Sequence, residues 1–312
     1  MEVKGSLKAI LGMLMIMGFT TLKSKGQVEP SVQEGKIIKT GSGRAQSFFF
    51  HSNIIDSRNI EVWLPDGYSS KQKYNVVYMH DGQMLFDSTT TWNKQEWHVD
   101  EVVGRLIAEG KLKQTIVVGI DNNGSKREAE FFPEKVVPLI PDPQKTDLLK
   151  LMPGGPIADN YLRFIVTELK PYIDQHYSTY KDAKHTFTGG SSLGGMISLY
   201  AICEYPKIFS GAFCMSTHWI GTFTQNPQIP DAYIDYLNTH LPSPRKHKLY
   251  FDHGDQTLDA LYAPSQLKVD LLFKAKGYDA DHFKSLVFPG AAHKESDWAK
   301  RLDIPFLFLL RR

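Results

Sequence analysis

The sequence predicts an α/β fold in which helices cover both faces of a mostly parallel central sheet. From residue 47 onward, short apolar runs that suit strands alternate with segments that suit helices. This order favours parallel strands joined by helices. Several of the apolar runs are unbroken stretches of Val, Ile, Phe and Tyr, as expected for strands that are buried on both faces. With 312 residues, of which 42% are hydrophobic and 22% charged, the chain is long enough for one large core.

The expected strands are short. The first two are adjacent and predict a hairpin, whereas helix-like segments separate most of the later ones. The strands are predicted at residues 47–50, 60–64, 76–79, 116–120, 186–188, 212–216, 248–251 and 285–288.

The expected helices lie between these strands. Apolar residues recur at helical spacing over residues 99–109 and over residues 160–175, where Pro171 predicts a kink. Residues 217–244 form a long segment with four prolines, which predicts a cap over a site. Three further helices are expected at residues 195–204, 264–276 and 296–310.

The first residues have the three-part pattern of a signal peptide. Lys4 and Lys8 precede an eleven-residue apolar run over residues 9–19, and Ser24 and Gly26 are small residues at positions −3 and −1 of a cut before Gln27. The apolar run is too short for a stable membrane span. We therefore expect residues 1–26 to be removed and the protein to be exported, to the periplasm or outside the cell.

The remaining chain divides into a polar lead-in over residues 27–46 and one catalytic domain over residues 47–312. Because Lys and Arg total 36 against 34 Asp and Glu, and no basic stripe occurs, nucleic acid is not an expected partner. Cys203 and Cys214, the two cysteines, form neither a disulfide framework nor a metal site. Two buried thiols are expected, with a single disulfide as the alternative. We expect no cofactor and no metal.

The strongest motif surrounds Ser192. Gly190-x-Ser192-x-Gly194 follows a short strand and precedes a helix, which is the nucleophile elbow of α/β-hydrolases. The sharp turn admits only small residues two positions either side of the serine, and it directs the backbone N–H of Leu193 at the site, where it can stabilise an oxyanion. Ser191 is the competing serine, but the glycines do not flank it symmetrically.

A general base and an acid should follow the nucleophile in that fold. His293 lies in a loop of small residues directly after the last predicted strand, where its imidazole can reach the serine; His253 and His247 are the fallback. The acid should follow the strand at residues 248–251, where Asp252, Asp255 and Asp259 are candidates. We favour Asp259 narrowly.

A second oxyanion donor should come from the loop after an early strand. Residues 76–79 lead into His80-Asp81-Gly82-Gln83, where the glycine would let the N–H of Gln83 face the site. No His/Asp cluster has the spacing of metal ligands. Trp97 and Trp219 lie in expected loops and are candidates for lining a substrate pocket.

The chain resembles a family of esterases that includes enterochelin esterases, feruloyl and acetylxylan esterases, and mycolyltransferases. The resemblance spans roughly residues 47–310. It implies that Ser192 and His293 are catalytic and that Leu193 and Gln83 form the oxyanion hole. Relatives often carry Thr-Leu-Asp-Ala where this chain has residues 257–260, which supports Asp259, although many have Glu in place of Gln256. The matching stretches are residues 63–68, 78–83, 119–122 and 190–195, and the His293 loop with Trp298.

The predicted activity is therefore hydrolysis of a carboxylic ester through a Ser-His-Asp triad, with a small-molecule or oligosaccharide ester as substrate. An acetyl or feruloyl group on a carbohydrate is the leading expectation. The alternatives are an enterochelin-type siderophore esterase and an acyltransferase that uses the same triad. A binding module with a decayed site is the alternative of a different class, and turnover of a chromogenic ester distinguishes it.

Overall fold

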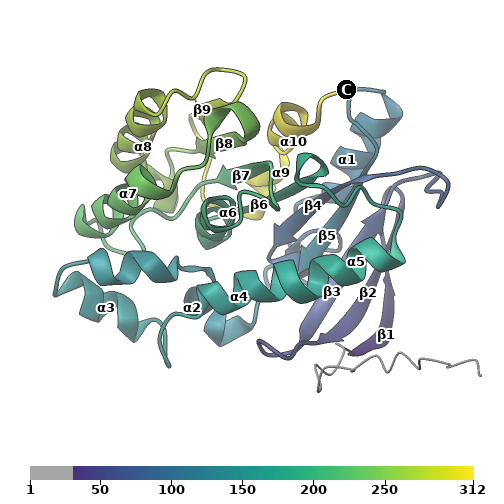
Figure 1. The fold of residues 1–312 in the computed structure, drawn as a ribbon, viewed down its shortest axis with the longest axis horizontal. Coiled ribbons are helices and arrows are strands. Elements are labelled where there is room, and N and C mark those ends of the chain that lie inside the picture. Colours follow the sequence, from purple (N-terminus) through teal and green to yellow (C-terminus); the bar gives the residue numbers. More distant parts are fainter. Residues whose placement is uncertain (1–30) are drawn as a thin grey trace, which may run out of the picture.

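The computed structural model describes residues 31–312 of the chain. The predicted signal peptide, residues 1–26, lies outside the described residues. A single nine-stranded sheet forms the centre of the molecule, in the order β1-β2-β3-β5-β4-β6-β7-β8-β9 (Figure 1). Its strands are β1 Ser31–Ile38, β2 Arg44–His51, β3 Arg58–Leu64, β4 Asn75–His80, β5 Thr115–Ile120, β6 Thr186–Ser191, β7 Gly211–Met215, β8 Lys248–His253 and β9 Phe283–Val287.

Helices connect these strands, and short 3₁₀ segments occur in several loops. The 3₁₀ turns that bear on the site are η1 (Gly82–Met84) and η7 (Thr257–Leu261). The helices are α1 Val99–Ala108, α2 Arg127–Phe131, α3 Gln144–Lys150, α4 Ala158–Phe164, α5 Lys170–His176, α6 Leu193–Glu204, α7 Gln228–His240, α8 Ala263–Ala275, α9 Glu295–Ala299 and α10 Asp303–Leu310.

The sheet is antiparallel at one side and parallel over the rest. β1, β2, β3 and β5 pair antiparallel, whereas β5, β4, β6, β7, β8 and β9 pair parallel. The predicted mostly parallel sheet is therefore confirmed, and so is the expected hairpin, formed by β2 and β3. Because parallel strands end at the same edge, the loops after β4, β6, β7, β8 and β9 meet there, and this edge is where open α/β sheets bind ligands.

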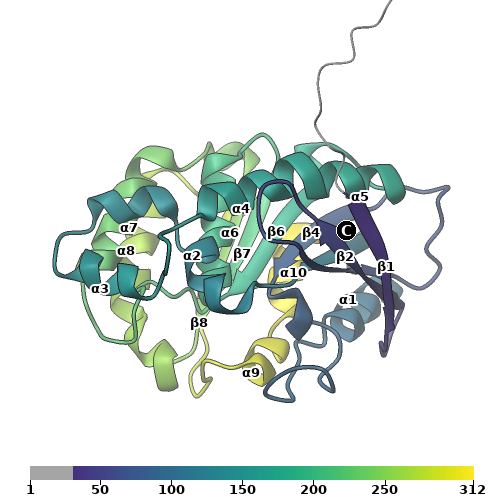
Figure 2. The ribbon, with the colours of Figure 1, turned by 90° about the horizontal axis from the view of Figure 1, so that it is seen from below.

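Two apolar cores lie on the two faces of the sheet. One contains Tyr161 of α4 and Met196 of α6, and the other contains Val103 of α1 and Phe306 of α10. Figure 2 shows α4, α5 and α6 on one side of the strands and α1 and α10 on the other. Strands β4, β5, β6 and β7 are buried at every position, which is why most of their residues are apolar or small.

Several boundaries differ from expectation. Residues 31–38, in the expected lead-in, form strand β1, which pairs with β2; its polar sequence suits an edge strand with one neighbour. The helix expected over 296–310 is broken into α9 and α10. The segment at 217–244 contains α7, which packs against α8, and residues 121–157 contain short helices that no periodicity predicted.

The expected helix around Pro171 is interrupted by a π-helical turn. Residues 165–169 form a π-helical turn between α4 and α5, and Pro171 stands in the first turn of α5. A proline lacks the N–H of a regular helix and clashes with the carbonyl four residues earlier. The wider π turn accommodates that clash.

Two further expectations concern thiols and membranes. Cys203 and Cys214 are both free and buried, and burial raises the pKa of each thiol. Over residues 31–312, no helix is both long and apolar enough to cross a membrane.

Candidate active site

Ser192 occupies a strained turn between β6 and α6. Its backbone has φ 59° and ψ −124°, a region that non-glycine residues rarely adopt and that costs about 1–3 kcal/mol. The turn is tightly packed, since a Cβ on Gly190 would lie 3.0 Å from the carbonyl carbon of Gly194. The Ser192 N–H donates to the Met215 carbonyl (3.0 Å) and holds the turn against β7. Ser192 therefore lies in a sharp turn between a strand and a helix.

His293 and Asp259 are brought together at the same edge of the sheet. Nδ1 of His293 lies 2.6 Å from Oδ1 of Asp259, whose side chain is fully buried. The other oxygen, Oδ2, accepts hydrogen bonds from Ser216 Oγ and from the Gly254 N–H, both at 2.6 Å. Burial alone would raise the pKa of Asp259, but the hydrogen bonds from His293, Ser216 and Gly254 outweigh it and hold that pKa below its usual value. Asp259 is therefore a carboxylate that fixes the imidazole.

The two loops that carry Asp259 and His293 are joined directly. The N–H groups of Asp255 and Gln256 donate to the Ala291 carbonyl, and the His293 N–H donates to Thr257 Oγ1 (2.9 Å). A Cβ on residue 254 would lie 2.0 Å from the Ala291 oxygen, so only glycine permits this approach.

Asp255 and Asp252, the other acid candidates, have different partners. Asp255 is exposed and accepts a hydrogen bond from the Gly290 N–H (2.7 Å), so it stabilises the loop before His293 and does not bind the imidazole. Asp252 is buried in β8, where Arg301 and the Tyr250 hydroxyl bind it.

The fallback histidines are also engaged elsewhere. His253 Nδ1 bonds to the Gly254 carbonyl, and both ring nitrogens of His247 bond to backbone carbonyls.

Sequence reasoning missed the residues that support Asp259. Ser216 stands directly after β7 with φ 43°, and its hydroxyl accepts from Trp298 Nε1 (2.9 Å) and Arg301 Nη2 (3.1 Å) while donating to Asp259. The Trp298 ring also packs edge-on against His293, with centroids 5.0 Å apart. These contacts join the end of β7 to η7 and α9, and no local sequence motif predicts them.

The two predicted oxyanion donors lie in adjacent segments. Leu193 is the first residue of α6, where backbone N–H groups have no intrahelical partner and the helix dipole favours negative charge. Gln83 lies in η1, directly after β4. A Cβ on Gly194 would lie 3.4 Å from Asp81 Oδ2, so the loop after β4 borders the elbow. Gly82 is required there, because its Cβ would lie 2.6 Å from the backbone of Gly119.

Asp81 anchors the loop after β4. It has φ 58°, and its carboxylate accepts two hydrogen bonds from Arg127 (2.7 and 2.8 Å) and one from Asn122 Nδ2 (2.7 Å). Burial would raise the pKa of Asp81, but the charge and hydrogen bonds of Arg127, with Asn122, hold it below its usual value. Next to it, burial lowers the pKa of His80 to about 3, so that imidazole is neutral and its hydrogen bond with the Tyr161 hydroxyl is structural.

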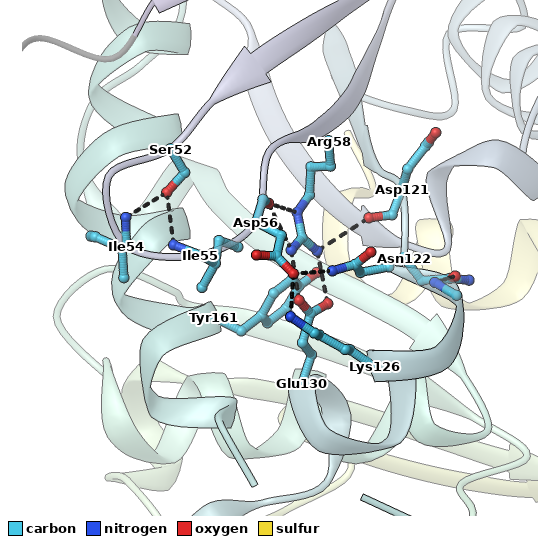
Figure 3. A network of polar contacts seen from close by, with 12 residues as sticks. Ser52, Ile54, Ile55, Asp56, Arg58, Asp121, Asn122, Lys126, Glu130 and Tyr161 are labelled. Carbon is cyan, nitrogen blue, oxygen red and sulfur yellow. Dashed lines mark hydrogen bonds and ion pairs between the residues drawn. The ribbon is translucent and has the colours of Figure 1, made fainter. Parts of the chain in front are cut away.

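A buried ion pair stabilises the helix that carries Arg127. Arg58 of β3 binds both carboxylate oxygens of Glu130 in α2 (2.6 and 2.8 Å) and donates to the Asp121 carbonyl (3.3 Å). Figure 3 shows the Arg58 guanidinium and the Glu130 carboxylate facing each other, with Asp121 to one side and the Tyr161 ring beside the guanidinium. Because Arg127 begins α2, the pair fixes the helix that presents Arg127 to Asp81.

Replacing Glu130 by glutamine is expected to lower the free energy of unfolding by about 3–5 kcal/mol, because the buried Arg58 charge would lose its partner. Urea denaturation followed by circular dichroism measures this. Asp56→Asn is the matched control: it removes an exposed partner of Lys126, and exposed pairs contribute at most about 1 kcal/mol. Equal small effects in both variants would contradict the supporting role of the buried pair.

The tryptophans proposed as pocket residues do not fit that role. Trp219 is fully buried, with its Nε1 donating to Gln266 Oε1 and its ring stacked near Phe251. Trp97 is 3% exposed and packs against Trp298. Both rings are covered by this chain's own side chains and belong to its cores.

Among the described residues, no group of three His, Cys, Asp or Glu side chains could hold a metal ion. One edge of the sheet instead carries Ser192 in a strained turn and His293 bound to the buried carboxylate of Asp259. These are the groups that acyl transfer through a covalent intermediate requires.

A family model described as "Putative esterase" matches residues 52–308. Among curated relatives, YjcH of Bacillus subtilis is 25% identical over 54% of this chain, and the match spans 60% of YjcH. The endo-1,4-beta-xylanase/feruloyl esterase of Xylanibacter ruminicola is 23% identical over 83% of this chain and 30% of its own length. The chain thus spans less than two thirds of either relative.

Solved structures with the same fold include a ferulic acid esterase and an enterobactin esterase. The ferulic acid esterase has a TM-score of 0.62 and 19% identity, covering 89% of this chain and 98% of that one. The enterobactin esterase FES from Shigella flexneri, solved in the presence of enterobactin, has a TM-score of 0.63 and 16% identity, covering 89% of this chain and 60% of that one.

Proposed function

Because the chain belongs to this esterase family, we propose that it is an exported serine esterase in which Ser192, His293 and Asp259 form the catalytic triad. The observation that carries the proposal is the 2.6 Å contact between His293 Nδ1 and the buried Asp259 carboxylate, made at the sheet edge that also holds the strained Ser192. A carboxylate without such a role would be expected in solvent, because burying it is costly unless hydrogen-bond donors surround it.

In the proposed reaction, Ser192 Oγ attacks the ester carbonyl carbon while His293 takes the serine proton. Asp259 holds the imidazole in the tautomer that can accept this proton and stabilises the imidazolium that forms. The N–H groups of Leu193 and Gln83 bind the oxyanion. His293 then protonates the departing alcohol, and water, activated by the same histidine, releases the acid from the acyl-enzyme.

The proposed substrate is an acetyl or feruloyl ester of a carbohydrate. The likeness to the ferulic acid esterase and to the xylanase/feruloyl esterase supports it. The likeness to the enterobactin esterase favours a catecholate siderophore ester as the second candidate. An acyltransferase would share the triad and differ only in passing the acyl group to an alcohol instead of water.

A substrate panel tests the proposed activity. We expect turnover of p-nitrophenyl acetate, and a kcat/KM on acetylated xylan or feruloylated sugars that is at least about 10-fold above that on a catecholate siderophore, because a mismatched site leaves buried polar groups unpaired. The opposite ranking would support the siderophore candidate. No turnover of any ester would contradict the esterase assignment.

Export is proposed from the pattern in residues 1–26. A chain that begins at Gln27 is expected to fold and to be as active as the full chain, since it keeps every strand of the described sheet. Mass spectrometry of the exported protein checks the cut before Gln27. A mature protein that retains Met1 would contradict it.

A further inference from the structure

His218 lies beside the proposed nucleophile and has no part in the mechanism above. It follows β7, and its backbone N–H donates to the carbonyl oxygen of Ser192 (3.2 Å). Its side chain is buried, with the residue 4% exposed. A polar ring in this position requires partners or a ligand.

One side of the His218 ring is fixed by Tyr262. Nδ1 lies 2.8 Å from the Tyr262 hydroxyl, and the Tyr262 ring packs edge-on against His293, with centroids 5.8 Å apart. Burial first, and then the nearby His293 and Arg127, lower the pKa of His218 to about 3. The ring is therefore neutral at physiological pH, with one nitrogen as donor and the other as acceptor.

The Tyr262 hydroxyl determines which nitrogen is the donor. If the phenol donates to Nδ1, its hydrogen is satisfied and Nε2 carries the ring proton. In the opposite arrangement the hydrogen of this buried phenol would have no acceptor within residues 31–312, which is costly. Nε2 makes no hydrogen bond within the described part of the chain. It is also absent from the polar atoms that are both fully buried and without a partner, so this nitrogen is not fully buried. It therefore reaches solvent as an N–H donor.

The sheet order indicates which part of an ester this donor would meet. The oxyanion loop follows β4, on one side of β6, whereas His218 follows β7, on the other side. His293, which must protonate the departing alcohol, also comes from that second side. The Phe223 ring, 74% exposed, lies 6.0 Å from the His218 ring and adds an open apolar surface. A donor beside an apolar ring suits a sugar, which has both hydroxyl oxygens and apolar C–H faces.

We propose that His218 binds substrate by donating its Nε2–H to a hydroxyl or ring oxygen in the alcohol part of the ester, with Tyr262 as the residue that positions it. The inference rests on the proposed function, because it takes the alcohol part to be a sugar. It adds a specificity-determining residue that acts on the alcohol and not on the acyl group.

Two esters that share an acetyl group but differ in the alcohol distinguish binding of the alcohol part from binding of the acyl group. For His218→Phe we expect KM on a monoacetylated xylo-oligosaccharide to rise about 10-fold, as for loss of one hydrogen bond, while kcat/KM on p-nitrophenyl acetate stays within about twofold. His218→Gln, whose amide can donate from a similar position, should recover most of the loss. Tyr262→Phe should give a smaller loss with the same selectivity. Circular dichroism confirms folding.

A binding measurement makes the test independent of turnover. In a Ser192→Ala background, adding His218→Phe should weaken calorimetric binding of the acetylated oligosaccharide about 10-fold. Equal losses on both esters, or unchanged binding and KM, would overturn the inference and leave His218 as a packing residue. Failure of the wild-type chain to hydrolyse either ester would instead contradict the esterase assignment, and the binding comparison would still decide the role of His218.

Discussion

Ser192→Ala is expected to lower kcat on p-nitrophenyl acetate by about 10⁶, the scale of losing the nucleophile of a serine hydrolase triad. Without Oγ no acyl-enzyme forms, and the imidazole held by Asp259 has no hydroxyl to deprotonate. The fold should persist, because alanine adopts the backbone at φ 59° at a cost similar to that for serine. Pre-steady-state kinetics on the wild-type chain should show a burst of p-nitrophenol that the variant lacks.

Ser191→Ala is the matched control. Ser191 is the last residue of β6, is 4% exposed and lies opposite Met215 in the sheet, so it belongs to the strand and lacks the strained backbone of Ser192. We expect this variant to keep kcat within a few-fold of wild type, as is usual for a substitution that leaves the reacting groups in place. An inactive Ser191→Ala protein with an active Ser192→Ala protein would show that the elbow has been assigned to the wrong serine.

Local signals made much of the fold predictable. Most of the parallel strands contain short apolar runs, and the Gly190-x-Ser192-x-Gly194 turn needs its own strand and helix on either side, so these elements could be placed from the sequence. Strand β1 was missed because an edge strand has only one neighbour and can be polar. The Pro-rich segment after β7 was expected to be a loop, and this placed Trp219 near substrate although it is buried against α8.

The supporting residues of the site could not be predicted, because they act across long separations in the chain. Ser216 and Arg301 are 85 residues apart and are joined by one hydrogen bond. Arg58 and Glu130 are 72 residues apart. The sequence favoured Asp259 over Asp255 only narrowly, with support from the resemblance. In the structure, Gly254 allows the loop that carries both acids to approach the loop that carries His293. As a result, the carboxylate of Asp259 bonds to His293, whereas that of Asp255 bonds to the Gly290 N–H.

Asp259→Asn is expected to lower kcat by about 10⁴ while the protein stays folded. An asparagine can still accept from Ser216 and Gly254, but its amide cannot stabilise the imidazolium and would favour the wrong tautomer of His293. Because the folded-state pKa of Asp259 is held below its usual value, the wild-type side chain stabilises the fold above the unfolded-state pKa. This contribution is lost as pH falls through the folded-state pKa, so stability of the variant should depend less on pH in that acidic range.

Asp255→Asn is the control for position and charge, since it lies four residues away in the same loop, is exposed and does not contact His293. We expect its kcat/KM on p-nitrophenyl acetate to stay within a few-fold of wild type, as for other surface substitutions. Both variants are compared on this one ester, with folding checked by circular dichroism. The reverse ranking would move the acid to Asp255. If both variants stayed active, His293 would work without either carboxylate. Asp252→Asn would then separate a triad with a different acid from a serine–histidine pair, because Asp252 is the one remaining candidate and shares Arg301 with Ser216.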